Sequence, residues 1–125
     1  EKIKNFKNYD VYIVDSYGEN KSFYRISNIV FLGGSMVSKG GQNPLEALKF
    51  GCNILHGIYT FNFKEVYKML EKEKLSSKVK NINDLEKKAF YLLNNKKNNL
   101  NKIKRFKKIG DLILKKNLNE LRKII

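Results

Sequence analysis

Residues 33–46, GGSMVSKGGQNPLE, limit most strongly what this chain can fold into. Two Gly-Gly pairs bracket a short loop, and Asn43-Pro44 then opens a helix-forming sequence. Asparagine is a favoured N-cap, and proline fits the first helical position because its missing N–H would be unpaired there anyway. The apolar run Ile29–Leu32 just upstream suits a buried strand. The sequence therefore predicts a strand, a glycine loop and a helix, in that order.

This unit has two interpretations. Unpaired N–H groups in the loop and at the helix start, together with the helix dipole, suit an anion such as phosphate at the carboxyl edge of a parallel sheet. Alternatively, the stretch is a flexible turn before a well-capped helix, since neither a Walker A nor a GxGxxG pattern is present. The loop is longer than the roughly 2–6 residues usual between strand and helix, and long ordered loops often have a function.

Strands and helices alternate along the chain, which predicts an α/β fold with a partial Rossmann-like parallel sheet flanked by helices. We expect about four strands, at residues 11–14, 29–32, 53–56 and 78–80. Helices are expected at residues 20–27, 44–50 and 62–74, and another is expected to be capped by Asp84. After a polar linker at 95–99, we expect a helix weakened by Gly110 and a last short helix.

Composition narrows the possible partners. The 125 residues are 42% hydrophobic, which is enough for one core, and no apolar run is long enough to span a bilayer. The formal net charge of +14 favours nucleic acid, anionic lipid or phosphorylated substrates, although a lysine- and asparagine-rich composition typical of an A/T-rich genome explains it equally. Cys52 is the only cysteine, so no intrachain disulfide can form, and one His with one Cys make no zinc site.

Several motifs, in order, resemble the 3-deoxy-D-manno-octulosonic acid (Kdo) transferases. They are Asp15-x-x-Gly18-Glu19, GGS-hydrophobic-V from Gly33, GG-x-N-P-L-E from Gly40, a glycine-bounded strand, and Thr60-Phe61-Asn62-Phe63. The resemblance covers residues 10–70. It implies a lipid A-modifying glycosyltransferase of the GT-B architecture, which transfers Kdo from CMP-Kdo to the lipid A precursor with inversion and without a metal or other cofactor.

The chain departs from this family at four positions. Gln42 stands where the family usually has a histidine, and Asn53 where it has a proline. Ile58 and Tyr59 replace a proline and a histidine. These differences concern donor-sugar contacts and activity more than the fold.

The resemblance also implies a domain organisation. We expect residues 1–94 to be part of the C-terminal, donor-binding half of a GT-B fold, and residues 95–125 to pack on the same domain or on the N-terminal acceptor domain. The family's general base belongs to the acceptor domain, so no catalytic residue is expected in this fragment, which should be soluble and inactive alone. The full-length protein is expected at the cytoplasmic face of the inner membrane.

Glu46 is the first candidate for a donor contact. The family resemblance implies that this carboxylate accepts hydrogen bonds from the ribose hydroxyls, a task that suits an acceptor-only group with two oxygens. The structural alternative is specific, because Asn43-x-x-Glu46 matches a capping box in which Glu46 reaches back to the Asn43 N–H.

The glycine loop supplies the other candidates. We assign Gly40, Gly41 and Asn43 to the phosphate, through backbone N–H groups and the Asn43 side chain. The opposite wall is expected to consist of Gly33, Gly34 and Ser35, with the Ser35 hydroxyl as a donor; alternatively, the two glycines only permit a sharp turn. Lys39 either adds charge near the leaving phosphate or is simply solvated.

Further candidates lie outside the loop. By resemblance, the backbone around Tyr17 and Gly18 meets the cytosine base with Glu19 nearby, although Glu19 also suits a first helical turn. Asp15 suits a cap or loop-fixing role as well as a ligand contact. Asn62 is expected to cap its helix. His56 is expected to be structural, because no Asp or Ser partner can be assigned to it as a base.

The basic residues near the end of the chain admit two hypotheses. They form either an ordinary solvated helix face or a patch that attracts the anionic cytoplasmic leaflet, at about 1 kcal/mol per residue near the surface. They are Lys102, Lys104, Arg105, Lys107 and Lys108. A GT-B transferase with a uridine donor and a basic nucleic-acid-binding module remain as alternative functions, the second argued from charge alone because no RNA-binding signature is present.

Overall fold

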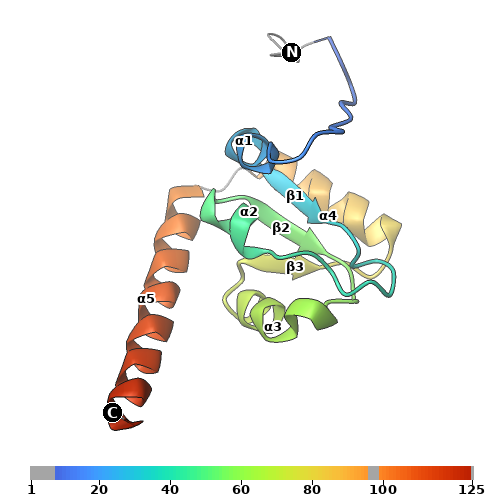
Figure 1. The fold of residues 1–125 in the computed structure, drawn as a ribbon. Coiled ribbons are helices and arrows are strands. Elements are labelled where there is room, and N and C mark those ends of the chain that lie inside the picture. The colour runs from blue at the N-terminus through green and yellow to red at the C-terminus, as the bar shows by residue number, and fades with distance from the viewer. Residues whose placement is uncertain (1–7, 96–98, 125) are drawn as a thin grey trace.

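The computed structural model describes residues 8–95 and 99–124, and Figure 1 shows their arrangement. A three-stranded parallel sheet has the order β1-β2-β3, with β1 at Ile29–Leu32, β2 at Asn53–His56 and β3 at Ser76–Lys78. The register pairs Leu32 with His56 and His56 with Lys78. The carboxyl ends of all three strands therefore meet at one edge, and the predicted α/β, Rossmann-like arrangement is confirmed.

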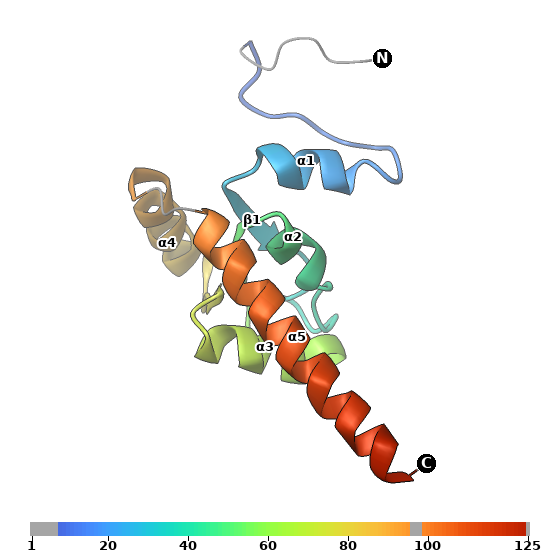
Figure 2. The same ribbon diagram turned by 90° about the vertical axis from the view of Figure 1, so that its left-hand side faces the viewer.

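Helices cover both faces of this sheet. The helices are α1 (Asn20–Ile26), α2 (Leu45–Lys49), α3 (Lys64–Lys72) after a short 3-10 turn η1 (Phe61–Phe63), α4 (Ile82–Asn94) and α5 (Asn99–Ile124). Figures 1 and 2 show α4 on one face of the sheet and α2 on the other. The cluster of buried residues lies on the α2 and α3 side of the sheet and contains no residue of α4: Leu32, Ala47, Leu48, Cys52, Ile54, Tyr67, Leu70 and Leu75.

The predicted strand at residues 11–14 is wrong. These residues lie outside any strand and are exposed, with Val11 78% and Ile13 82% accessible. The chain before α1 runs away from the sheet, so no strand among the described residues lies beside it to pair with (Figure 1). A β-branched segment forms a strand only where a partner completes its hydrogen bonds. The described sheet consequently has three strands rather than about four.

The C-terminal region also differs from the expectation. One continuous helix, α5, replaces the two expected helices, and Gly110 does not interrupt it. The cost of one interior glycine, about 1 kcal/mol, is small beside the hydrogen bonds of a long helix. Phe106 and Ile109 pack against the core, whereas later apolar residues such as Leu114 and Leu121 are exposed where α5 projects from the body (Figure 2). Residues 96–98 of the expected linker lie outside the described residues.

Two smaller predictions near α4 need correction. The last strand lies at Ser76–Lys78 rather than at residues 78–80. Asn81, not Asp84, caps α4, because the Asn81 side chain accepts a hydrogen bond from the Asp84 N–H at 2.9 Å. Asp84 instead accepts a hydrogen bond from the Lys80 N–H at 3.0 Å, and this bond lowers the pKa of the Asp84 carboxyl. Asn81 thus caps the helix, and Asp84 bonds the residue before the cap, one position earlier than in a capping box.

Candidate donor site at the carboxyl edge of the sheet

The glycine loop leaves β1 at the carboxyl edge of the sheet. Gly34, Gly40 and Gly41 have φ angles of +70°, +89° and +75°, a region that L-residues with side chains rarely adopt. These three glycines therefore determine the path of the loop. A Cβ added to Gly33 would meet no atom within 4 Å, and Gly33 is exposed, so packing does not require a glycine there.

The segment after β2 holds this loop from the other side. The Asn62 N–H donates to the Gly40 carbonyl at 3.1 Å, and the Asn62 side-chain amide donates to the Lys39 carbonyl at 3.0 Å. A Cβ on Gly40 would lie 2.5 Å from Asn62 Cγ and 2.6 Å from a Phe61 ring carbon. The expected helix-capping role of Asn62 is wrong, because Asn62 lies within η1 and its side chain bonds the loop.

Tyr67 makes a second connection to the loop. Its hydroxyl donates to the Gln42 carbonyl at 2.6 Å, while its ring is buried against His56 at a centroid distance of 4.4 Å. Burial raises the pKa of Tyr67 to about 12, so the hydroxyl keeps its proton throughout the physiological range. Neither Tyr67 nor the loop-bonding role of Asn62 was foreseen from the sequence, where residues 62–74 showed only the period of an amphipathic helix.

Ser35 is fully buried and its hydroxyl is used inside the protein. It donates to the Leu32 carbonyl at 2.5 Å and accepts from the Gly57 N–H at 2.8 Å. This geometry argues against the expected donor contact through the Ser35 hydroxyl. Ser35 instead joins the two loops that follow β1 and β2.

His56 is buried at the end of β2, in keeping with the structural role expected for it. Its Nδ1 lies 2.8 Å from the Gly57 carbonyl, and its Nε2 lies 3.5 Å from both Ser76 Oγ and Glu71 Oε1. Because a carbonyl oxygen can only accept, Nδ1 carries the hydrogen. Burial lowers the pKa of His56, although the Gly57 carbonyl and the Glu71 carboxylate act in the opposite direction.

Two of the amides expected to hold a phosphate are already occupied. The Gly41 N–H donates to the Gly34 carbonyl at 3.1 Å, and the Leu45 N–H donates to Asn43 Oδ1 at 3.0 Å. The Gly41 N–H, which was expected to donate to a phosphate, is therefore not free to do so in this structure. Within residues 8–95 and 99–124, the Gly40 N–H and the Asn43 side-chain NH₂ donate no hydrogen bond; Asn43 is exposed, whereas Gly40 is buried.

Glu46 lies on the exposed side of α2. Its carboxylate accepts no hydrogen bond from the described residues, so the capping box that its spacing suggested does not form. The expected N-cap role of Asn43 is also wrong: Pro44 occupies the N-cap position of α2 without a side-chain cap, and Asn43 Oδ1 accepts a hydrogen bond only from the Leu45 N–H. The carboxylate lies close enough to Tyr24 to raise the pKa of that phenol, after the larger effect of burial. The Glu46 carboxylate is thus a hydrogen-bond acceptor that follows the glycine loop and that none of the described residues uses.

Gly18 and Glu19 are not brought to the glycine loop. Glu19 directly precedes α1, where its carboxylate accepts a hydrogen bond from the Ser16 hydroxyl at 2.9 Å. Residues 15–19, which include Asp15 and Tyr17, are exposed, and in both views this segment lies apart from the loop that follows β1 (Figures 1 and 2). The expected position of Gly18 and Glu19 beside the donor required a strand at residues 11–14 to carry them to the sheet, and these residues form none.

The four departures from the family pattern occupy different places. Gln42 is in the loop, where its backbone carbonyl accepts from Tyr67, and Ile58 and Tyr59 are exposed in the neighbouring loop. Asn53 begins β2 at the opposite edge of the sheet, where its Nδ2 donates to the Asn28 carbonyl at 2.9 Å. Lys39 is exposed in the loop, as either of its two interpretations requires.

The basic residues of α5 do not share one face. Lys102 donates to Asn53 Oδ1, and Arg105 donates to the backbone carbonyl of Glu73 and to its carboxylate. Lys104, Lys107 and Lys108 are exposed. In the part of the chain that the structure describes, no helix is long and apolar enough to cross a bilayer, and no three His, Cys, Asp or Glu side chains gather as metal ligands would.

Comparisons with known proteins agree with the resemblance seen in the motifs. A 3-deoxy-D-manno-octulosonic acid transferase of Haemophilus influenzae is 43% identical over 91 residues, which are 72% of this chain and 21% of that protein. The Aquifex aeolicus enzyme of the same name is 38% identical over 88 residues, 70% of this chain and 25% of its own length. No protein-family model matches the chain.

A solved structure has the same fold. The C-terminal CMP-Kdo binding domain of WaaA from Acinetobacter baumannii superposes with a TM-score of 0.68 and 23% identity, over 77% of this chain and 50% of that one. The chain thus spans between a fifth and a quarter of the two transferases compared above. These similarities confirm that the chain is related in sequence to a part of the 3-deoxy-D-manno-octulosonic acid transferases.

Proposed function

We propose that this chain is the donor-binding part of a GT-B glycosyltransferase that transfers Kdo from CMP-Kdo to the lipid A precursor in lipopolysaccharide biosynthesis. The observation that carries the proposal is the Glu46 carboxylate, exposed beside the glycine loop and left without a hydrogen bond among the described residues. The sequence relationship to Kdo transferases supports the choice of donor.

In this proposal each group has a defined task. Glu46 accepts hydrogen bonds from the ribose hydroxyls of CMP. The Gly40 N–H and the Asn43 side-chain NH₂ donate to the phosphate, where negative charge grows as CMP departs. Gly33, Gly34 and Gly41 shape the loop, and Ser35 fixes its base. No metal or other cofactor takes part, and the general base comes from the acceptor domain, so this chain binds nucleotide weakly and transfers nothing alone.

The direct test is calorimetric titration of the chain with CMP, UMP and UDP, followed by a crystal soaked with CMP. We expect CMP to bind more tightly than either uridine nucleotide, with its ribose against Glu46. Tighter binding of UMP or UDP would favour the alternative, a GT-B transferase with a uridine donor. Transfer of Kdo by the purified chain would contradict the proposed division of roles.

The proposal includes a location. The lipid acceptor lies in a membrane, and the exposed Lys104, Lys107 and Lys108 on α5 would attract the anionic cytoplasmic face of the inner membrane. Sedimentation with vesicles containing phosphatidylglycerol should exceed that with neutral vesicles, and replacing the three lysines by glutamine should remove the difference. Nucleic acid is not an expected partner; RNA or DNA binding that persists at physiological salt would contradict this.

A further inference from the structure

His56 lies where the two loops of the candidate donor site join the body of the protein. It is the last residue of β2, its side chain is fully buried, and it is the only histidine in the chain. We propose that His56 is a positioning residue of the donor site: its neutral imidazole holds both loops in the conformation that receives the nucleotide, and its protonation releases them. This inference rests on the proposed function, which makes the glycine loop a nucleotide site.

The first connection from His56 to the loops runs through Gly57. The Nδ1–H of His56 donates to the Gly57 carbonyl at 2.8 Å, and the Gly57 N–H donates to Ser35 Oγ, also at 2.8 Å. Both backbone groups of Gly57 are therefore bonded, one to the imidazole and the other to the loop after β1. Because the Ser35 carbonyl also accepts from the Tyr59 N–H, the imidazole fixes the point at which the two loops are joined.

The second connection runs through Tyr67 on α3. The rings of Tyr67 and His56 pack with their centroids 4.4 Å apart, and the Tyr67 hydroxyl donates to the Gln42 carbonyl in the glycine loop at 2.6 Å. Glu71 lies four residues after Tyr67, on the same face of α3, and its Oε1 is 3.5 Å from His56 Nε2. Helix α3 thus contacts both the ring face and the Nε2 of His56, and Tyr67 links that contact to the glycine loop.

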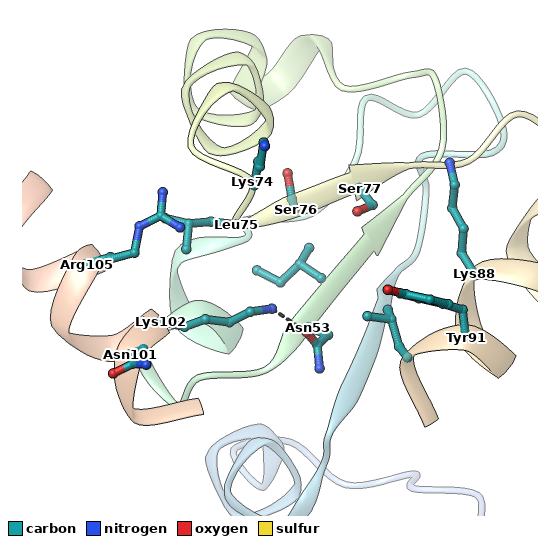
Figure 3. Close-up of a pocket in the computed structure, with 12 residues that line it drawn as sticks. Asn53, Lys74, Leu75, Ser76, Ser77, Lys88, Tyr91, Asn101, Lys102 and Arg105 are labelled. Carbon is teal, nitrogen blue, oxygen red and sulfur yellow. Dashed lines mark hydrogen bonds between the residues drawn. The ribbon is translucent and has the colours of Figure 1, made fainter. Parts of the chain in front are cut away.

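The surroundings of Nε2 suit a neutral ring. With the hydrogen on Nδ1, Nε2 can only accept, and the hydroxyl of the buried Ser76 lies 3.5 Å away as a donor. Figure 3 shows the Ser76 side chain pointing from β3 toward α3. A second proton would turn Nε2 into a donor, for which the Glu71 carboxylate is the acceptor at 3.5 Å. Protonation therefore changes the contact between His56 and the helix that carries Tyr67.

Among the described residues, the charged groups around His56 come from three elements. Glu71 of α3 favours the protonated imidazole, but its carboxylate is also paired with Lys78 of β3 at 3.3 Å. Lys78 and Lys88 of α4 disfavour protonation, and Figure 3 shows the Lys88 ammonium at the carboxyl end of β3, where it donates to the Lys78 carbonyl. Tyr67, with its pKa raised to about 12, stays uncharged. Burial is the largest influence and lowers the pKa of His56, so a charged imidazole favours opening of the surrounding contacts.

Nuclear magnetic resonance of the untagged chain tests the coupling without any ligand. A single histidine gives a single set of ring resonances, so the titration of His56 can be followed directly. We expect the amide resonances of Gly40 and Gly41 to shift with the same midpoint as the His56 ring. The amide of Gly110, on α5, is the control and should not follow it. Glycine-loop amides that do not titrate with His56 would overturn the proposal.

A nucleotide provides the second readout. The methyl ester of CMP suits this test, because its phosphodiester keeps a single negative charge over the range in which His56 titrates. If the neutral form of His56 binds the ester better, linkage requires that saturation with the ester lower the pKa of His56, whereas the mere approach of an anion would raise it. We expect a lowered pKa, and about fivefold weaker binding of the ester when His56 is protonated. A raised or unchanged pKa in the complex would overturn the proposal.

Failure of the proposed function is distinguishable from failure of this inference. If the ester and CMP do not bind at all, the donor-binding role is contradicted. The titration of the Gly40 and Gly41 amides then still decides whether His56 controls the glycine loop, because that measurement needs no nucleotide.

Variants separate positioning from stability. Asparagine at position 56 keeps an N–H donor near the place of Nδ1 but does not titrate, whereas leucine keeps neither property. His56→Leu should weaken binding of the ester by about tenfold, and His56→Asn should recover most of that affinity. Cys52→Ala, at a buried position before β2, should lower the unfolding free energy without changing affinity. An equal loss of affinity in Cys52→Ala and His56→Leu, with circular dichroism showing both folded, would overturn the proposal.

Discussion

Ser35 and Gly57 are in direct contact across the two loops at the carboxyl edge of the sheet. The Gly57 N–H donates to Ser35 Oγ at 2.8 Å, and a Cβ on Gly57 would lie 2.1 Å from the Ser35 carbonyl oxygen. The Tyr59 N–H donates to that same carbonyl at 2.9 Å. The loop after β2 therefore holds the loop after β1 by backbone contacts that tolerate no side chain at residue 57.

Replacing Gly57 by alanine should destabilise the protein. The added methyl group overlaps backbone atoms that cannot move aside, which costs about 1–3 kcal/mol of unfolding free energy. Urea unfolding measures this loss. Gly33→Ala is the control, because a Cβ there meets nothing within 4 Å and its effect should be small. Equal stabilities of the two variants would contradict the close contact.

Replacing Glu46 by alanine should weaken CMP binding without changing stability. The Glu46 carboxylate has no hydrogen-bond partner among the described residues, so its loss leaves no buried group unpaired. We expect CMP affinity to fall by about tenfold, and the melting temperature to stay within error of the parent. Glu86→Ala, at an exposed position of α4, is the matched control for charge. A parallel loss of stability would instead favour a capping role for Glu46.

Replacing Tyr67 by phenylalanine tests whether the loop is held in place from α3. The change removes only the hydroxyl that donates to the Gln42 carbonyl, at a cost of about 1 kcal/mol of unfolding free energy. We expect CMP affinity to decrease as well, because the loop then samples more conformations before it binds. Calorimetry and urea unfolding on the same samples measure both effects. Unchanged CMP affinity would show that this bond stabilises the fold only.

The stability of the protein should decrease as the pH falls below about 6.5. Burial lowers the pKa of His56 in the folded state; Lys78 and Lys88 lower it further, and Glu71 raises it in part. The unfolded chain therefore takes up the proton first as the pH falls. The loss begins at the unfolded pKa of 6.5 and continues until the folded protein is also protonated.

The variant His56→Gln isolates this effect. Its unfolding free energy should change less between pH 7 and pH 5, in round figures, than that of the parent, whatever its absolute stability. Because only the slopes of unfolding free energy against pH are compared, a general destabilisation by the substitution does not obscure the result. Identical slopes in the parent and the variant would show that groups other than His56 cause the acid sensitivity.

Replacing Lys74 by glycine should stabilise the protein. Lys74 follows α3 with a φ of +56°, a left-handed conformation that costs a residue with a Cβ about 1 kcal/mol and costs glycine almost nothing. Lys68→Gly, in the exposed interior of the same helix, should have the opposite sign and lose about 1 kcal/mol. Chemical unfolding of the two variants checks the signs; destabilisation by Lys74→Gly would contradict the argument.

Local sequence determined much of this protein. The apolar runs at β1 and β2 and Gly51 just after α2, with a φ of +79°, lie as their patterns predict, and α2 begins within one residue of the predicted start. These features depend on a few neighbouring residues, because burial period, capping and positive φ are local properties. The family motifs can likewise be recognised in the sequence alone, since each is a short run of neighbouring residues.

Only the tertiary structure decided which of these groups are free to act. Ser35 and Gly41 matched a binding pattern and Asn62 a helix cap, yet Ser35 is bonded to Gly57, the Gly41 N–H to Gly34 across the loop, and Asn62 to Lys39, whereas the capping bond expected of Glu46 does not form. The physical reason is that a polar group has a limited number of hydrogen bonds, and which partners use them depends on segments far apart in the chain.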